Sequence, residues 1–86
     1  MENTLYFKDT RYNDLNNYPL KIYKVEHSRM LIEILDNEHI QGKPHYFTSP
    51  HSRDDYISNI KKYILKINHD ELKDIQNYWK ENQIDI

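Results

Sequence analysis

The residues of this chain that are best suited to chemistry lie within ten positions, 47–56, which read FTSPHSRDDY. His51, Asp54 and Asp55 offer nitrogen and oxygen atoms of the kind that bind divalent metal ions. Arg53 carries a guanidinium group that suits a phosphate. Together these residues would form the site of a small metal-dependent nuclease, which is the weakest of our three functional hypotheses.

The same stretch is explained more economically as the start of a helix. Ser49 or Ser52 can act as the N-cap, and Pro50 suits the first helical position if Ser49 is the cap. Asp54 and Asp55 would then stabilise the positive end of the helix dipole. Consecutive residues point about 100° apart on a helix, so these two aspartates do not easily share one ligand. We therefore expect a helix entrance and no bound metal.

Several catalytic classes are disfavoured by composition. The chain has no cysteine, which excludes disulfides and thiolate catalysis, and its single glycine excludes a glycine-rich phosphate loop. No two of its five histidines are four residues apart, and no G-x-S-x-G motif occurs. We therefore expect a protein that is not an enzyme and that uses no cofactor.

The length of 86 residues predicts a single small globular domain spanning 1–86. No apolar run approaches the length of a membrane span and no signal-peptide pattern is present, so we expect a cytoplasmic protein without a membrane partner. The chain lacks alanine and is rich in Ile, Lys, Asn and Tyr, whose codons are AT-rich. That bias suggests a phage or another mobile element as the source.

The first half of the chain predicts strands. Residues 1–19 read as a partly irregular segment, with a short β-like run at 5–8 inside it. Residues 20–49 read as strands, because branched and aromatic residues cluster at 22–25, at 31–34 and at 45–47. The residues His27 and Ser28 between the first two of these runs predict a hairpin turn. The alternatives are one long bent strand and a short helix over residues 29–35.

The second half of the chain, residues 53–82, predicts helices. Apolar residues recur at helical spacing in two groups: Tyr56, Ile60, Tyr63, Ile64 and Ile67, then Leu72, Ile75 and Trp79. Asn68 followed by Glu71 resembles a capping box between the groups. We favour two helices over one kinked helix. The expected fold class is α+β, with a small antiparallel sheet of two to three strands followed by a C-terminal helical pair that covers one sheet face.

An excess of aromatic residues favours a binding function. The chain has eight tyrosines and one tryptophan, more than so small a core is expected to bury. Our first hypothesis is a small non-catalytic module that binds another protein and inhibits or modulates it. The expected contact residues are Tyr12, Tyr18, Tyr78 and Trp79, with Asp70, Asp74 and Glu81 providing charge complementarity.

Nucleic-acid binding is the alternative hypothesis. Arg53, Lys61, Lys62 and Lys66 would form the basic face of a helix over 53–67, with tyrosines interleaved. The net charge of −2 argues against a dedicated phosphate-backbone binder, so we expect nucleic acid less than protein as the partner. A homodimer is a further expectation, because a small sheet must hide its edges.

Overall fold

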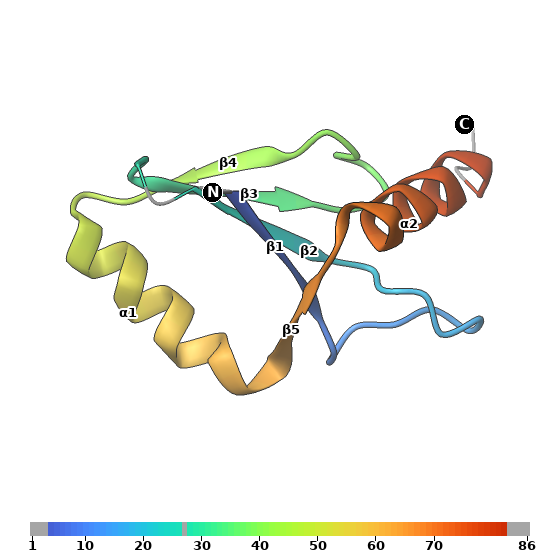
Figure 1. Cartoon of the computed structure of the whole chain (residues 1–86), viewed down its shortest axis with the longest axis horizontal. Coiled ribbons are helices and arrows are strands. Elements are labelled where there is room, and N and C mark those ends of the chain that lie inside the picture. Colours follow the sequence, from blue (N-terminus) through green and yellow to red (C-terminus); the bar gives the residue numbers. More distant parts are fainter. Residues whose placement is uncertain (1–3, 27, 83–86) are drawn as a thin grey trace.

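The computed structural model describes residues 4–26 and 28–82 and shows an α+β fold (Figure 1). Five strands form one antiparallel sheet: β1 (Thr4–Asp9), β2 (Ile22–Glu26), β3 (Leu31–Leu35), β4 (Lys43–Tyr46) and β5 (Ile64–Ile67). Two α-helices and a short 3₁₀ helix follow the first four strands: α1 (Pro50–Ile60), η1 (Lys61–Tyr63) and α2 (His69–Glu81). The α+β class is confirmed, whereas the expected sheet of two to three strands is wrong.

The strand order β4-β3-β2-β1-β5 follows from a simple path of the chain. The first four strands form a meander, in which each strand pairs with the next. After α1 the chain returns to the edge of the sheet opposite β4, where β5 pairs with β1. Strands β4 and β5 are therefore the two edges of the sheet.

The helices cover opposite faces of the sheet, which corrects the expected helical pair on a single face. Successive residues of a strand point to opposite faces. Ile22 packs with Leu72, Ile75 and Trp79 of α2, whereas its neighbour Tyr23 belongs to a cluster that packs against α1. The molecule thus has three layers with the sheet in the middle, and its core is divided into two small clusters.

The predicted helix over residues 53–67 is wrong from Ile64 onward, since the chain continues through the 3₁₀ helix η1 and then forms strand β5. Helix α1 ends at Ile60, and Ile64 has extended backbone angles, φ −114° and ψ 146°. A strand is favoured here because the backbone N–H and C=O groups on one edge of β1 would otherwise be unpaired. Pairing with β5 satisfies these groups. Ile64 and Ile67 also fit this strand, because Ile64 packs against the α1 cluster and Ile67 lies in the α2 cluster.

The start of each helix is set by a side-chain cap. Ser49 Oγ accepts a hydrogen bond from Ser52 N at 3.1 Å, so Ser49 rather than Ser52 is the cap, with Pro50 at the helix start. Asn68 Oδ1 accepts from Glu71 N at 2.8 Å, which confirms the predicted start of α2. The expected role of Asp54 and Asp55 at the helix dipole is wrong, because the first turn of α1 contains no acidic residue.

The single glycine lies where a side chain does not fit. Gly42, just before β4, has φ 110°, and a Cβ atom there would lie 2.8 Å from Glu33 Oε2.

In the described part of the chain, no helix combines the length and the apolar character needed to cross a membrane.

Candidate protein-binding surface

Residues 10–21 connect β1 to β2 and form the β1–β2 loop, which projects from the end of the sheet (Figure 1). Its two arms are held together by backbone hydrogen bonds. Leu20 N donates to Tyr12 O at 3.0 Å, and Asp14 N donates to Tyr18 O at 2.9 Å. Asn13 and Pro19 form an isolated antiparallel bridge between these bonds. The loop is therefore a closed, hairpin-like structure.

The tip of the loop is organised by Asp14. Its Oδ1 accepts hydrogen bonds from Asn16 N and Tyr18 N, both at 2.9 Å, and its backbone oxygen accepts from Asn17 N at 3.0 Å. Asn17 has φ 64°, a left-handed conformation that asparagine tolerates better than most residues. These bonds fix the turn in which Leu15 lies.

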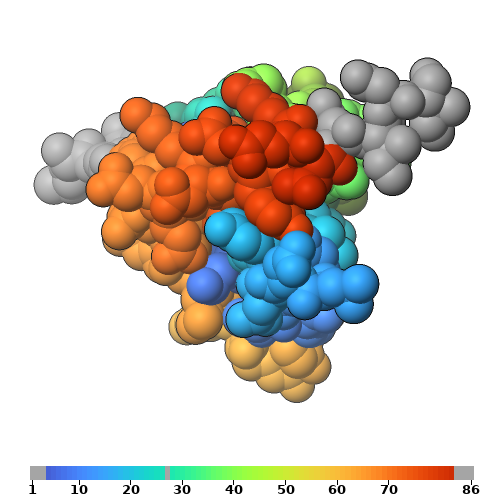
Figure 2. Space-filling model, turned by 90° about the vertical axis from the view of Figure 1, so that its right-hand side faces the viewer, coloured from blue at the N-terminus to red at the C-terminus, as the bar shows by residue number. Residues whose placement is uncertain are grey.

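Helix α2 supports the loop from one side, and Figure 2 shows the loop in blue directly beneath the red helix. The rings of Tyr18 and Tyr78 stack, with centroids 3.9 Å apart and an interplanar angle of 3°. Tyr78 donates its hydroxyl hydrogen to Asp14 Oδ2 and accepts a bond from Asn16 Nδ2 at 2.9 Å. Trp79 Nε1 donates to Pro19 O at 2.9 Å. The loop is thus held at its tip and at its base.

The bond between Tyr78 and Asp14 also changes the pKa values of these two side chains. The hydroxyl of Tyr78 lowers the pKa of the Asp14 carboxyl below its usual value. The same bond raises the pKa of the Tyr78 hydroxyl. Asp14 is therefore ionised and Tyr78 neutral at physiological pH, which keeps this contact intact there.

Large apolar side chains of the loop are turned toward solvent. Leu15 is fully exposed at the tip, and Tyr12, Tyr18 and Leu20 are also exposed. We call these four residues the loop surface. A loop that is held by hydrogen bonds and presents exposed leucine and tyrosine side chains is a candidate binding surface, since tyrosine is enriched among the residues that dominate protein interfaces.

The structure brings together three of the four aromatic residues expected to bind a partner. Tyr12 and Tyr18 lie in the loop surface, and Tyr78 lies beneath it. Trp79 is 2% exposed and packs in the core, so it supports the surface from below.

The three acidic residues expected to contact a partner lie on α2. Asp70, Asp74 and Glu81 are all exposed. Asp74 and Glu81 stand four residues before and three residues after Tyr78, which places them on the same side of the helix as Tyr78. Asp70 lies one turn before Asp74 and is the most distant of the three from Tyr78 along the helix.

Leu15 and Leu20 of the loop surface are residues that the sequence analysis missed. A signal was present, because Leu15 is a single apolar residue inside NDLNNYP, a run of turn-forming residues. An apolar residue surrounded by turn formers indicates an exposed position at a loop tip, and Leu15 is fully exposed there.

The residues of the nucleic-acid hypothesis do not share one exposed surface. Arg53 is buried, and its Nη1 donates to Glu26 O at 3.4 Å and to Arg29 O at 2.5 Å. Its guanidinium also pairs with Asp54. Arg53 thus joins α1 to the β2–β3 turn. Lys61, Lys62 and Lys66 are exposed, on η1 and β5.

Of the three residues proposed as metal ligands, His51 and Asp55 contact each other and Asp54 does not join them. His51 Nε2 lies 3.3 Å from Asp55 Oδ2, whereas Asp54 pairs with Arg53. Among residues 4–26 and 28–82, no group of three or more His, Asp or Glu side chains is arranged to hold a metal ion.

Asp9 is a fully buried carboxylate whose contacts indicate a structural role. Its oxygens accept hydrogen bonds from Tyr23 Oη at 2.7 Å and from Arg11 N, Nε and Nη2 at 2.8–3.1 Å. Burial alone would raise the pKa of Asp9, but the bonds from Arg11 and Tyr23 outweigh it and hold the pKa at about 2. A carboxylate that is ionised at neutral pH and already accepts four hydrogen bonds is poorly suited to proton transfer.

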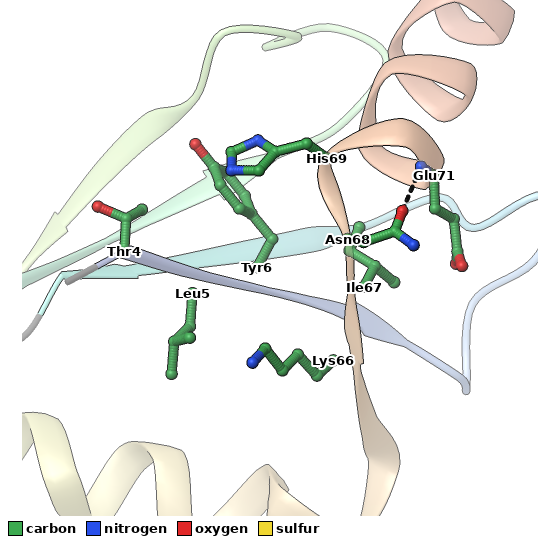
Figure 3. A pocket seen from close by; sticks show the side chains of 8 residues that line it. All are labelled: Thr4, Leu5, Tyr6, Lys66, Ile67, Asn68, His69 and Glu71. Atoms are coloured by element: carbon green, nitrogen blue, oxygen red, sulfur yellow. Dashed lines mark hydrogen bonds between the residues drawn. The ribbon is translucent and has the colours of Figure 1, made fainter. Parts of the chain in front are cut away.

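A hollow of about 420 Å³ lies where β1 continues past the end of β5 (Figure 3). Its lining includes Tyr6, Lys66, Asn68 and His69. The rings of Tyr6 and His69 meet edge to face with centroids 5.7 Å apart, and Glu71 pairs with Lys8 at 3.1 Å. These contacts are ordinary packing and ion-pair contacts at the edge of the sheet. None of them joins a nucleophilic side chain to a general base.

Comparisons of the chain with protein-family models, with curated proteins and with solved structures find no match. The evidence on function is therefore the chemistry of the molecule's own surfaces. Of these, the loop surface combines exposed apolar side chains with a backbone that is held by several hydrogen bonds.

Proposed function

We propose that this chain is a small non-catalytic module that binds another protein through the loop surface and thereby inhibits or modulates it. The observation that carries the proposal is the fully exposed side chain of Leu15 on a loop fixed by Asp14 and Tyr78. Because the loop is already ordered, little conformational entropy is lost when it binds. Leu15 and the flanking tyrosines then act as anchors.

The proposed partner is a folded protein with an apolar pocket whose rim is basic. Leu15 enters the pocket, and Tyr12 and Tyr18 cover its margin. Asp74 and Glu81, on the side of α2 that carries Tyr78, face the basic rim and contribute mainly to the rate and specificity of association. Trp79 acts indirectly, by holding Pro19 at the base of the loop.

We place this encounter in the cytoplasm, since a chain without cysteine gains nothing from an oxidising compartment. A phage or mobile element fits the proposal, because a small protein from such a source acts by occupying a surface of a larger host protein. The partner of the loop surface is then a host protein rather than a second copy of this chain.

The test is a capture experiment with the purified chain on a support and a lysate of the source organism's host. We expect a protein that the wild type retains and that Leu15→Asp does not. The retained protein is then purified and titrated. Loss of a buried leucine anchor is worth about 1.5–3 kcal/mol, so we expect the dissociation constant to rise by at least about tenfold.

The matched control is Tyr46→Asp, which introduces the same charge at a side chain that is 73% exposed on β4. It should retain the partner with unchanged affinity. A partner that binds wild type and Leu15→Asp equally well would contradict the role of the loop surface. A capture with no protein that depends on Leu15 would contradict the proposed function.

A further inference from the structure

The two edges of the sheet differ in their capacity to accept another strand. At β4, Phe47 N donates to Met30 O at 2.9 Å. Bonding alternates along an antiparallel pair, so His45 faces β3 while the backbone groups of Pro44 and Tyr46 face outward. Proline has no N–H at this outward position, and a proline on an edge strand discourages further pairing.

The edge formed by β5 has no such block. Thr10 N donates to Tyr63 O at 2.8 Å, and the alternation along β1 then turns the backbone groups of Ile64 and Lys66 outward. Both residues have a free N–H position, since neither is proline. Leu65, between them, is 56% exposed. This edge therefore combines available hydrogen-bonding groups with an exposed apolar side chain.

We propose that β5 is a homodimer interface, in which the β5 strands of two copies pair antiparallel about a two-fold axis at Leu65. In this register Leu65 lies opposite Leu65 of the second copy, and Ile64 lies opposite Lys66. The two Ile64–Lys66 pairs each exchange two backbone hydrogen bonds. Moving the register by two residues would place Lys66 opposite Lys66, which like-charge repulsion disfavours.

The charges on either side of β5 agree with antiparallel pairing. Lys61 and Lys62 precede the strand on η1, and Asp70 and Glu71 follow it on α2. A two-fold axis brings the basic end of one copy beside the acidic end of the other. Parallel pairing would place like charges together.

The hollow at the end of β5 fits the same arrangement. In the proposed register, Tyr63 and Lys62 of one copy lie opposite Ile67 and Asn68 of the other, and these two residues line the hollow. Figure 3 shows the open space beside Ile67 and Asn68. The hollow thus gives the preceding residues of the second copy a place to pack.

The homodimer uses residues different from those of the loop surface. The dimer can therefore be tested independently of the proposed binding of another protein. Strand β5 is only four residues long, and we expect a weak dimer that depends on concentration. Each dimer would carry two copies of the loop surface.

The first test measures the mass of the full-length protein in solution by sedimentation over a concentration series. We expect a monomer–dimer equilibrium for the wild type. Lys66→Pro removes an outward N–H without breaking a bond to β1, and it should raise the dimer dissociation constant by at least about tenfold. Tyr46→Pro is the matched control, because it makes the same change at the outward position of β4 and should leave dimerisation unchanged.

The second test uses the absence of cysteine from the chain. Opposed residues in a pair without mutual hydrogen bonds have Cα atoms about 4.5 Å apart, a distance that a disulfide spans. Leu65→Cys should therefore form a covalent dimer under mild oxidation. Tyr46→Cys, an exposed cysteine on the opposite edge, should form it much more slowly.

Each outcome decides the proposal. A wild type that remains monomeric at several hundred micromolar, or a dimer unaffected by Lys66→Pro, would overturn it. So would equal cross-linking at positions 65 and 46. A monomer that instead binds an extended peptide along β5 would also overturn it, since the edge would then serve another protein. Leu15→Asp should dimerise like the wild type, which separates this result from the test of the loop surface.

Discussion

Arg53 shows how the position of one residue decides its role. In the sequence its guanidinium group is of the kind that suits a phosphate. In the fold, Ser49 starts α1 one turn earlier, and Arg53 meets the carbonyl oxygens at the β2–β3 turn. The same guanidinium that would bind a phosphate on the surface holds a hairpin turn when it is buried.

We expect Arg53→Met to destabilise the protein. Methionine keeps much of the apolar volume but removes the Arg53 donor from the Arg29 and Glu26 carbonyl oxygens, of which Glu26 O still accepts a bond from Arg29 N at 3.2 Å. Losing charged hydrogen bonds at a buried position lowers the free energy of unfolding by about 2–4 kcal/mol. Urea denaturation followed by the fluorescence of Trp79 measures this change.

The control for this substitution is Asn59→Met, which places the same side chain at an exposed position of α1. It should change the free energy of unfolding by less than about 0.5 kcal/mol. Equal stability of Arg53→Met and wild type would show that the bonds of Arg53 to the turn do not support the fold.

At the scale of the elements, the loop and α2 act as one unit. Tyr78 is the link, since its ring stacks on Tyr18 and its hydroxyl joins Asp14 to Asn16. Tyr78→Phe keeps the stacked ring and removes only the hydroxyl. We expect the amides of Asn16 and Tyr18 to exchange hydrogen faster, and the captured partner to bind several-fold more weakly, because the tip is less fixed before binding.

Hydrogen exchange read by NMR measures this effect residue by residue. Tyr46→Phe is the control, because it removes a hydroxyl from an exposed tyrosine on β4 and should leave loop exchange unchanged. Unaltered exchange at Asn16 and Tyr18 in Tyr78→Phe would mean that the backbone bonds of Asp14 are sufficient to hold the tip.

Residue patterns over a few neighbouring positions predicted helix α2 correctly but did not predict strand β5. The Asn68 cap and the buried stripe of Leu72, Ile75 and Trp79 were predicted, because both depend on residues a few positions apart. Strand β5 was missed because Ile64 and Ile67 match a helical period as well as a strand. The deciding interaction is pairing with β1, more than fifty residues away along the chain.

The candidate site was predicted only in part for the same reason. Tyrosines in a polar segment indicate exposure, which holds for Tyr12 and Tyr18. The contact of Tyr78 with this segment depends on how α2 packs beside the loop, as does the position of Leu15 at the tip. The sequence shows which residue types are available for such a surface, whereas the fold determines which of them lie together.

At the scale of the whole molecule, the sheet divides a small core into two clusters, so neither face alone buries much apolar surface. The sheet therefore needs firm anchoring between its strands. Asp9 provides one such anchor, because it lies at the end of β1 and accepts a hydrogen bond from Tyr23 on β2.

This anchor makes the stability of the protein dependent on pH in the acid range. The pKa of Asp9 is about 2 in the fold and 3.8 in its absence. Since the pKa is lowered by folding, the stabilisation is fully present above about pH 4 and is lost as the pH falls from 3.8 toward 2. We expect the urea midpoint to fall steeply across this window.

Asp9→Asn tests the origin of that slope. The substitution should lower the free energy of unfolding at pH 7 by about 1–3 kcal/mol, because the charged bonds with Arg11 are weakened. The variant should then lose less further stability between pH 4 and pH 2 than the wild type does. Asp55→Asn changes an exposed carboxylate of α1 and should keep the wild-type slope. Parallel curves for wild type and Asp9→Asn would assign the acid sensitivity to other carboxylates.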